Sequence, residues 1–352
     1  MIRKIIRIAL FSVIGIAGAI LILFLVLIVS GSENFRIYLP VERKTSYELP
    51  DGSLYPPGLH AAGNQLVTDA GKTVRLRGVM IPDPYRLEGE KRFNQELISD
   101  IQATGANVIR VPVHPENWQR DKDYLWRYLD PLVSWAGEAG IYVIIDLHFI
   151  GNIATGEGDL MPDLTIPAAE FADQFWSQVA LYFRNAPHVL FEIYNEPADI
   201  HVTDWRNSSA HLVTLIRSLD IRQTLIIGGV EYSRDLSWVL ESPLQDYNLA
   251  YAAHIYPAHS KNNWAYWFGE VARSYPVLIT EWGYLDAKTV EGPAYLAGNR
   301  QSYGESLLAY LDELGSGWIA CWYDDEWLPP MFNSGRASLN EYGQWVIDEL
   351  KP

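Results

Sequence analysis

The stretch Leu190-Phe191-Glu192-Ile193-Tyr194-Asn195-Glu196-Pro197 holds the signal for the fold and the signal for the chemistry. It begins as a mostly apolar run of strand length and ends in two polar residues and a proline. A continuous apolar run of this length is typical of a parallel strand that is buried on both faces. We therefore expect a central strand at residues 189–194 with polar groups at its carboxyl end.

Similar apolar runs recur on both sides of this stretch, and helical patterns separate them. The other expected strands are residues 74–81, 107–113, 142–147, 225–229, 250–255, 277–281 and 318–323. Expected helices include residues 124–139, 168–183, 204–219, 304–314 and 341–350. Eight strands alternating with helices predict an α/β fold of the (β/α)₈ TIM-barrel type. An open doubly wound sheet is the alternative, but residues 78–82 do not form the glycine-rich loop expected after its first strand.

The sequence before the barrel contains two expected features. Residues 64–67 and the turn at 69–72 resemble a small hairpin that leads into the first strand. Residues 8–29 carry no charge, are almost entirely aliphatic, and follow Arg3, Lys4 and Arg7. At about 1.5 Å per residue this run can cross a hydrocarbon core of about 30 Å.

The N-terminal run predicts a membrane anchor with the rest of the chain outside the cytoplasm, because basic residues favour the cytoplasmic side. The competing interpretation is a cleaved signal peptide, which has a shorter apolar region and a small-residue cleavage site. Either one makes the catalytic part extracytoplasmic. The predicted organisation is an anchor at residues 1–30, a linker at 31–57 and a catalytic domain at 58–352.

Composition excludes several functional classes. The formal net charge of −16 over 352 residues argues against binding to nucleic acid, because an acidic surface repels phosphate backbones. Cys321 is the single cysteine, and no spacing of Cys and His resembles a zinc or iron–sulfur site. The 13 Trp and 21 Tyr residues suit either a large core or a cleft that stacks sugar rings.

Ionisable and polar side chains gather where the expected strands end. In an α/β barrel the active site forms at the carboxyl ends of the strands. Glu196 ends the fourth strand and Glu281 the seventh, so they can face each other across the barrel opening. Two facing carboxylates are what glycoside hydrolysis needs, one as a proton donor and the other as nucleophile or base. The other candidates at these strand ends are Arg110, His148, Asn195, His254, Tyr256 and Trp322.

The same residues, taken in order, resemble glycoside hydrolase family five, the cellulase and mannanase family. Residues 190–197 resemble its acid/base motif, and Ile279-Thr280-Glu281-Trp282-Gly283 resembles its nucleophile strand. The resemblance spans about residues 60–350. Other matching segments are Leu76-Arg77-Gly78-Val79, Val108-Ile109-Arg110-Val111-Pro112-Val113, Asp146-Leu147-His148, His254-Ile255-Tyr256 and Trp322.

The resemblance implies a role for each site residue. Glu196 would be the acid/base and Glu281 the nucleophile of a retaining double displacement, without metal or organic cofactor. Asn195 would bind the sugar 2-hydroxyl. Arg110 and Tyr256 would hold and polarise Glu281. His148 and His254 would bind sugar hydroxyls or orient Glu196, and Trp322 would lie under the sugar ring.

Further residues near the strand ends have two interpretations each. Glu192 shares the strand parity of Glu196, so we expect it inside the barrel, paired with a buried cation. His114 and Trp118 begin a loop that either lines the cleft or packs elsewhere. The acidic cluster at residues 324–326 is more typical of a solvated loop than of a ligand site. Trp264, Trp267 and Trp327 suit outer sugar subsites and core packing equally.

The predicted function is hydrolysis of a β-linked glycan of the glucan or mannan type, with an oligo- or polysaccharide as partner. The loops Phe149-Ile150-Gly151-Asn152 and Trp327-Leu328-Pro329-Pro330 depart from the family pattern, so the sugar stays open. One alternative is a membrane-anchored transglycosylase that remodels envelope glycans. Another is a catalytically silent glycan-binding protein, whose usual mark is the loss of one carboxylate, and both carboxylates are present here.

Overall fold

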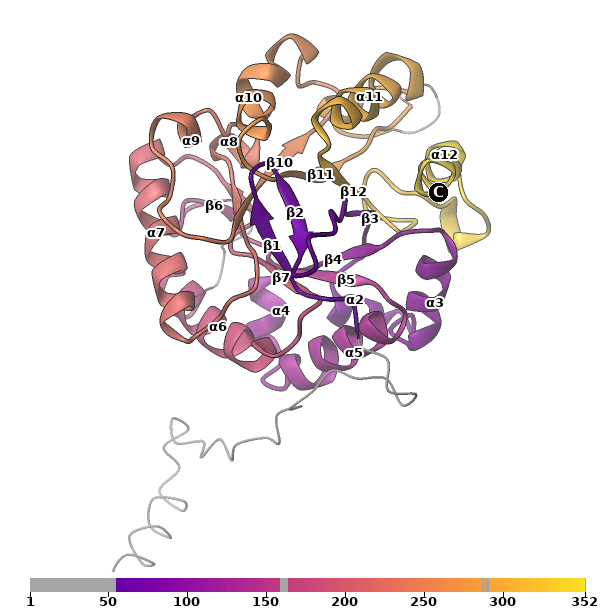
Figure 1. Ribbon diagram of the computed structural model, residues 1–352. Helices are drawn as coiled ribbons and strands as arrows, with labels where there is room; N and C mark the ends of the chain where they lie inside the picture. Colours follow the sequence, from indigo (N-terminus) through magenta and orange to yellow (C-terminus); the bar gives the residue numbers. More distant parts are fainter. Residues whose placement is uncertain (1–54, 159–163, 287, 289–290, 352) are drawn as a thin grey trace, which may run out of the picture. The chain divides into compact units, whose positions relative to one another are not determined.

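A closed barrel of eight parallel strands forms the centre of the described part of the chain (Figure 1). The computed structural model describes residues 55–158, 164–286, 288 and 291–351. Around the barrel the strands are β3 (Arg77–Met80), β4 (Val108–Val113), β5 (Tyr142–Leu147), β7 (Val189–Glu192), β9 (Leu225–Gly228), β10 (Leu249–Ile255), β11 (Val277–Trp282) and β12 (Gly317–Ala320). The predicted (β/α)₈ barrel is confirmed.

Side chains of the strands point alternately into the barrel and toward the helices. In β5, Tyr142 and Ile144 belong to the inner core, whereas Val143 and Ile145 pack in the outer core beneath the helices. Both faces of these strands are buried, which explains the continuous apolar runs in the sequence. The same alternation sends Arg110 of β4 and Asp146 of β5 inward at the carboxyl end.

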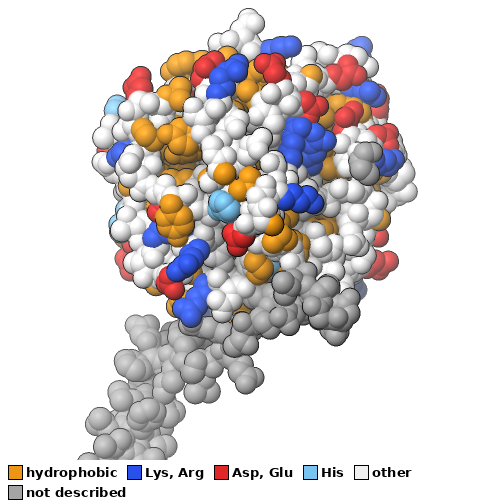
Figure 2. Space-filling view, in the orientation of Figure 1, with side chains coloured by type: hydrophobic (Ala, Val, Ile, Leu, Met, Phe, Trp, Pro, Cys, Tyr) orange, Lys and Arg blue, Asp and Glu red, His pale blue; other side chains and the backbone are white. Residues whose placement is uncertain are grey.

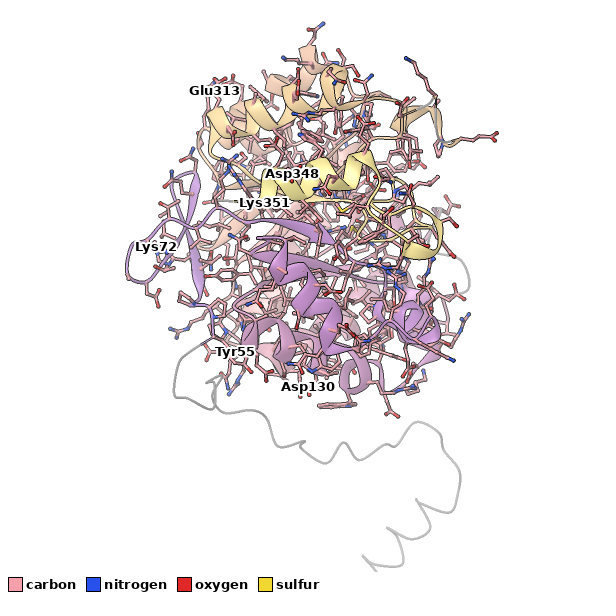
Figure 3. The ribbon with its side chains drawn as sticks, turned by 90° about the vertical axis from the view of Figure 1, so that its right-hand side faces the viewer. Tyr55, Lys72, Asp130, Glu313, Asp348 and Lys351 are labelled. Atoms are coloured by element: carbon pink, nitrogen blue, oxygen red, sulfur yellow. The ribbon has the colours of Figure 1, made fainter. Side chains whose placement is uncertain are left out.

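Helices surround the barrel and bury one apolar stripe each. In α6 (Ala168–Phe183) the buried side chains Phe171, Phe175 and Val179 recur every four residues, the spacing of one helix face. The other long helices are α3 (Gln95–Ala103), α5 (Asp130–Glu138), α7 (Val202–Ser218), α11 (Glu305–Leu314) and α12 (Glu341–Leu350). Figure 3 shows α12 near the end of the chain, where Lys351 lies 2.8 Å from Asp348.

Short helical segments fill the connections. They are α2 (Pro84–Gly89), α4 (Pro115–Arg120), α8 (Val230–Ser233), α9 (Trp238–Glu241), α10 (Glu270–Ala272), the π-helical turns η1 (Leu125–Leu129), η3 (Ala265–Gly269) and η5 (Arg300–Gly304), and the 3₁₀ turns η2 (Lys261–Asn263), η4 (Ala294–Leu296) and η6 (Ser334–Arg336). The helix expected at residues 124–139 is thus divided between η1 and α5, and the one expected at 304–314 begins within η5.

A two-stranded hairpin covers the amino-terminal end of the barrel (Figure 1). It consists of β1 (Leu59–Ala62) and β2 (Gln65–Thr68), and its Leu59 and Leu66 complete the inner core. The turn expected at residues 69–72 is present, because Val67 forms an antiparallel bridge with Thr73 and the N–H of Thr68 donates to the carbonyl of Lys72. A second turn, at Gly63 and Asn64, joins β1 to β2. Gly63 has a φ of +59°, which glycine adopts without the steric cost that a Cβ adds.

A second pair of short strands links two loops at the carboxyl end of the barrel. The strand β6 (Ile150–Gly151) pairs in parallel with β8 (Glu196–Pro197). The loop after β5 thereby fixes the backbone of Glu196, whose N–H donates to the carbonyl of Phe149 at 3.0 Å.

The predicted anchor at residues 8–29 and most of the predicted linker lie outside the described residues. Within the described part of the chain, no helix combines the length and the apolar character needed to cross a bilayer.

Figure 2 shows acidic and basic side chains interspersed on the face that carries the hairpin.

Candidate active site

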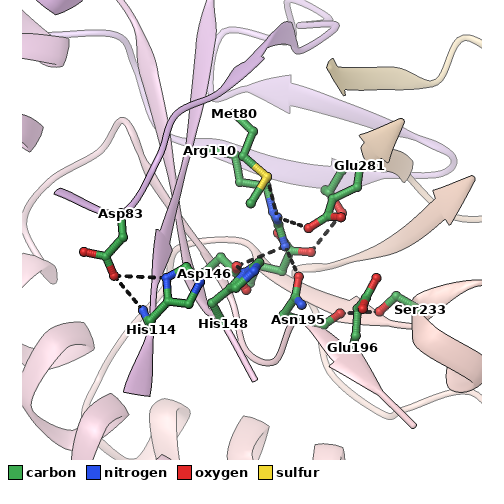
Figure 4. Close-up of polar contacts among 12 residues, drawn as sticks. Met80, Asp83, Arg110, His114, Asp146, His148, Asn195, Glu196, Ser233 and Glu281 are labelled. Atoms are coloured by element: carbon green, nitrogen blue, oxygen red, sulfur yellow. Dashed lines mark hydrogen bonds and ion pairs between the residues drawn. The ribbon is translucent and has the colours of Figure 1, made fainter. Parts of the chain in front are cut away.

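A cleft of about 530 Å³ opens at the carboxyl end of the barrel. Six predicted site residues line it, namely His148, Asn195, Glu196, Tyr256, Glu281 and Trp322. The other two, Arg110 and His254, are buried beneath the cleft and contact its carboxyl groups. Figure 4 shows the contact between Arg110 and Glu281. The structure therefore brings all eight predicted residues together.

Glu281, in β11, is surrounded by hydrogen-bond donors. Arg110 Nη1 donates to its Oε1 at 2.7 Å, and the Tyr256 hydroxyl donates to its Oε2 at 2.8 Å. Burial by itself would raise the pKa of Glu281, but the charges of His254 and Arg110 outweigh burial and lower it. The site therefore keeps Glu281 ionised.

The environment of Glu196, in β8, shifts its pKa in the opposite direction. Its Oε1 lies 2.7 Å from Nδ1 of His254, and burial raises the pKa of Glu196 although this contact opposes the shift. The negative charge of Glu281 raises it further. The site thus holds one carboxyl group that favours the ionised form and one that favours the protonated form.

The two carboxyl groups lie close together. One oxygen of Glu196, one oxygen of Glu281 and one nitrogen of His254 lie within 4.8 Å of one another. Such a cluster could ligate a metal ion by spacing alone. The pKa of His254 opposes this, because the charge of Glu281 and the contacts with Glu192 and Glu196 outweigh burial and raise it to about 10. A metal ion would have to displace that proton, and the positive charge of Arg110 close by opposes a further cation.

Arg110 is the centre of a buried ionic network. It donates through Nε to Glu192 at 2.6 Å and lies 3.1 Å from Asp146. Glu192 faces the interior and is paired with a buried cation, as its strand parity predicts. The carboxyl group of Asp146, whose pKa burial raises, in turn lies 2.6 Å from Nδ1 of His148 and orients that imidazole at the cleft.

In the side-chain amide of Asn195, the oxygen has a hydrogen-bond partner and the nitrogen has none among the described residues. Its Oδ1 accepts a 2.7 Å hydrogen bond from Arg110, which settles the orientation of the amide. Its Nδ2 is buried and has no hydrogen-bond partner among the described residues. A buried donor without a partner is costly, so this nitrogen is suited to a ligand acceptor in the cleft.

Several aromatic and cationic residues of the cleft carried no signal in the sequence. Tyr232, Arg234, His259 and Tyr295 all line it, and they lie on the loops after β9, β10 and β11. Sequence reasoning missed them because loop residues show no periodicity. Thr280 was also passed over as a site residue, although its hydroxyl lies 3.1 Å from His254 and 2.8 Å from Glu192.

The structure decides between the two interpretations of the tryptophans. Trp327 lines the cleft, with its ring centroid 4.6 Å from that of Trp322. Trp264 is buried in the core, and Trp267 packs under the guanidinium of Arg234. Trp118 packs against Tyr124 and Phe175 rather than in the cleft.

Two further loop residues are held by polar contacts. The ring of His114 contacts that of His148, and its Nδ1 lies 3.1 Å from Asp83. The expectation of a solvated acidic cluster is wrong for Asp324, which is buried and accepts a 2.6 Å hydrogen bond from Arg92.

Comparison with known proteins identifies the family. The family model for cellulase, glycosyl hydrolase family 5, matches residues 67–325. Endoglucanase E-5 of Thermobifida fusca is 24% identical over 317 residues, which are 83% of this chain and 63% of that protein. Endoglucanase A of Butyrivibrio fibrisolvens is 26% identical, covering 83% of this chain and 68% of that protein. The chain thus spans about two thirds or less of the length of these relatives.

Solved structures agree with the fold. A beta-glucanase from Saccharophagus degradans in its native form has a TM-score of 0.79 and 27% identity, over 84% of this chain and 93% of that one. The same enzyme in complex with cellotetraose has a TM-score of 0.81 and 25% identity, over 90% and 98% of the two chains. The catalytic domain of Thermobifida fusca endoglucanase Cel5A, at 21% identity and a TM-score of 0.71, supports the fold alone.

Proposed function

The chain belongs to glycosyl hydrolase family 5 and is an O-glycosyl hydrolase, and from this premise we propose that it cleaves a β-linked glucan with retention of configuration. Glu281 is the nucleophile and Glu196 the acid/base. The observation that carries the proposal is a close pair of carboxyl groups with opposite pKa shifts. An oxygen of Glu196 lies within 4.8 Å of an oxygen of Glu281, and the pKa of Glu196 is raised whereas that of Glu281 is lowered. Retaining glycosidases separate these groups by about 5–5.5 Å, whereas inverting enzymes leave about 6.5–9.5 Å for a water.

In the first step Glu281 attacks the anomeric carbon while Glu196 gives its proton to the glycosidic oxygen. The bond between that carbon and the oxygen breaks, the leaving sugar departs as an alcohol, and an ester joins the glycan to Glu281. Arg110 and Tyr256 keep the attacking carboxylate ionised and oriented through their two hydrogen bonds. The free amide nitrogen of Asn195 is the group that binds the neighbouring sugar hydroxyl.

In the second step Glu196 acts as a base. Esterification removes the negative charge of Glu281, which had helped to raise the pKa of Glu196. Glu196, which gave up its proton in the first step, therefore stays ionised beside His254 and takes a proton from water, and the resulting hydroxide attacks the anomeric carbon and breaks the ester. Glu281 returns to its carboxylate and Glu196 to its acid form.

The β-glucan assignment rests on relatives. The matched proteins are named endoglucanases, and the beta-glucanase that is 25% identical was solved with cellotetraose. A mannan or another β-glycan is the alternative substrate. A screen of the purified protein on β-glucans, mannans and xylans distinguishes these, because the favoured polysaccharide gives the highest rate of reducing-end release.

The mechanism is tested with a 2-deoxy-2-fluoro glycoside bearing a good leaving group, which slows the second step. Mass spectrometry of a peptic digest should then show one sugar attached to the peptide that contains Glu281. The variant Glu281→Gln should neither be labelled nor turn over substrate. A label on another residue, or equal activity of Glu281→Gln and the wild type, contradicts the assignment.

Transglycosylation is the second candidate activity, and two exposed rings in the cleft favour it. Tyr232 and Tyr295 line the cleft with 42% and 48% of their surface exposed. Such rings offer stacking surfaces for an acceptor sugar, which would compete with water for the glycosyl-enzyme. Mass spectrometry of the products formed with an added oligosaccharide acceptor separates transfer from hydrolysis.

A further inference from the structure

A β-bulge in β11 places two consecutive side chains inside the barrel. Beside β10, Ala253 pairs with Ile279 and His254 pairs with Glu281, so Thr280 is an additional residue in β11. The register against β12 shifts over the same segment. In a regular strand Thr280 and Glu281 would point to opposite faces. Bulges redirect side chains in this way and are frequent beside active sites.

The neighbouring residues show the break in alternation. Leu278 belongs to the inner core, Ile279 and Trp282 belong to the outer core, and Thr280 and Glu281 both contact residues inside the barrel. The bulge therefore brings the Thr280 hydroxyl into the site without moving Glu281 out of it.

Thr280 forms the middle of a chain of hydrogen bonds that ends at Glu196. The Thr280 hydroxyl lies 2.8 Å from Glu192 Oε1 and 3.1 Å from His254 Nε2. The other ring nitrogen of His254, Nδ1, lies 2.7 Å from Glu196 Oε1. All four side chains are at least 88% buried, so water does not readily replace these partners.

The direction of each hydrogen bond follows from the charge of Glu192. Burial would raise the pKa of Glu192, but Arg110 and His254 outweigh burial and lower it to about 2. As a carboxylate Glu192 can only accept, so the Thr280 hydroxyl donates its single proton to it. The oxygen of Thr280 is then left to accept, and Nε2 of His254 must carry the proton that it receives.

We propose that Thr280 is a positioning residue of the acid/base: by holding the proton of His254 on Nε2, it makes Nδ1 a proton donor to Glu196 Oε1. Oε2 of Glu196 is then the oxygen that carries the catalytic proton to the leaving group. The proposal rests on the assignment of Glu196 as acid/base. The proposal concerns which atoms of His254 and Glu196 carry protons. The contact between the two side chains is observed and does not depend on the proposal.

Removal of the Thr280 hydroxyl would leave Nε2–H of His254 without its hydrogen-bond acceptor, because the next oxygen, Glu192 Oε1, lies 3.8 Å away. The imidazole would then lose that proton more readily, and Glu196 would lose a neighbouring positive charge. The ionisable groups that face this pair from the surrounding strands and loops include Arg110, Asp146, His148, Glu192, Tyr256, His259, Glu281 and Tyr295. Their charges are the same in both proteins, so the variant isolates the effect of the hydroxyl.

The test compares Thr280→Val, which keeps the shape, with Thr280→Ser, which keeps the hydroxyl. The basic limb of kcat/KM on an aryl β-cellobioside reports the pKa of the acid/base. We expect this limb to move upward by about 1 pH unit in Thr280→Val, since loss of an adjacent opposite charge raises a carboxyl pKa. Thr280→Ser should restore the wild-type limb. A Thr280→Val profile that coincides with that of the wild type overturns the proposal.

A matched control removes a buried threonine hydroxyl elsewhere. Thr224 donates to the carbonyl of Leu59 at 3.0 Å at the amino-terminal end of the barrel. Thr224→Val should lose stability but keep the basic limb of the wild type. An equal shift in this control would assign the effect to general destabilisation and overturn the role of Thr280.

A second measurement does not depend on catalysis. ¹⁵N NMR of the imidazole nitrogens, with His254→Gln to assign the signal among the 8 histidines, reports the protonation of His254 directly. Near pH 7 the wild type should show both nitrogens protonated, and Thr280→Val should show one. If aryl β-cellobiosides are not hydrolysed but the NMR result holds, the proposed function fails and the hydrogen-bond chain stands. If the His254 signal is unchanged in Thr280→Val, the proposed hydrogen-bond chain is refuted while the proposed function stands.

Discussion

The guanidinium of Arg110 lies 2.7 Å from the carboxylate of Glu281, and both side chains are buried in the barrel. Arg110 also contacts Glu192 at 2.6 Å and Asp146 at 3.1 Å, so a single cation serves three carboxyl groups. This arrangement ties the stability of the barrel to the ionisation of the nucleophile, because the same charge supports both.

The variant Arg110→Met should therefore lose activity and stability together. Removing one partner of a buried ion pair leaves uncompensated charge and costs about 3–5 kcal/mol. The measurement is the free energy of unfolding in urea. Arg120→Met is the control, since its partner Glu116 is exposed and the pair is worth less than about 1 kcal/mol. Similar losses in both variants would contradict the special position of Arg110.

The variant Tyr256→Phe should impair the nucleophile without unfolding the protein. It removes the 2.8 Å hydrogen bond to Glu281 Oε2, and a hydrogen bond to a charged group is worth about 1.5–3 kcal/mol. We expect kcat/KM to fall roughly 10- to 100-fold, and the acid limb of its pH profile to move toward neutral pH, because Glu281 would ionise less readily. The control is Tyr142→Phe. The hydroxyl of Tyr142 donates to the carbonyl of Pro57, far from the cleft, so its removal should leave the acid limb unchanged.

Stability should decline on both sides of neutral pH. The pKa of His254 is raised from 6.5 to about 10, so its contribution is complete below pH 6.5 and is lost as the pH rises toward about 10. The pKa of Glu192 is lowered from 4.5 to about 2, so its contribution is complete above pH 4.5 and is lost as the pH falls toward about 2. Melting temperatures across this range should show a weaker alkaline decline in His254→Gln. An identical decline in both proteins would refute the assignment to His254.

Much of the barrel could be predicted because burial on both faces leaves a continuous apolar signal. The strands at residues 142–147 and 250–255, for example, agree with β5 and β10 to within one residue. Carboxyl-end residues such as Glu196, Glu281 and Arg110 could be found because strand ends in a parallel barrel meet at one face.

The features that sequence reasoning missed break a local rule or lie in loops. The bulge makes both Thr280 and Glu281 face inward, which strand alternation does not allow. A polar residue directly before Glu281 in an otherwise apolar strand is the signal that could have indicated it. At residues 231–233 three consecutive non-glycine residues have positive φ, and Ser233 donates to the carbonyl of Asn195. No residue pattern marks this turn, because tertiary contacts hold it.

Trp327 should contribute to the binding of longer oligosaccharides. Its ring lines the cleft beside Trp322, and the guanidinium of Arg86 covers it at 4.9 Å from the ring centroid. Loss of one stacked sugar contact is worth about 0.5–1.5 kcal/mol, so Trp327→Ala should raise KM for long oligosaccharides about 3- to 10-fold. Tyr266→Ala, an exposed ring outside the residues that line the cleft, serves as the control. An equal rise in KM for the shortest cleaved substrate would place Trp327 outside any outer subsite.

The uncharged run at residues 8–29 should hold the full-length protein in a membrane as an uncleaved anchor. In cells the protein should sediment with membranes, resist extraction at alkaline pH, and retain Met1 as judged by mass spectrometry. Arginines introduced together as Leu21→Arg and Leu23→Arg each cost about 2.5–3.5 kcal/mol at the centre of a spanning helix, so this variant should move to the soluble fraction. Substitution of the exposed Tyr266 by Arg adds positive charge outside the run and should leave the protein in the membrane. A mature chain that begins near residue 30 would instead identify the run as a signal peptide, since a segment that has been removed cannot anchor the catalytic domain.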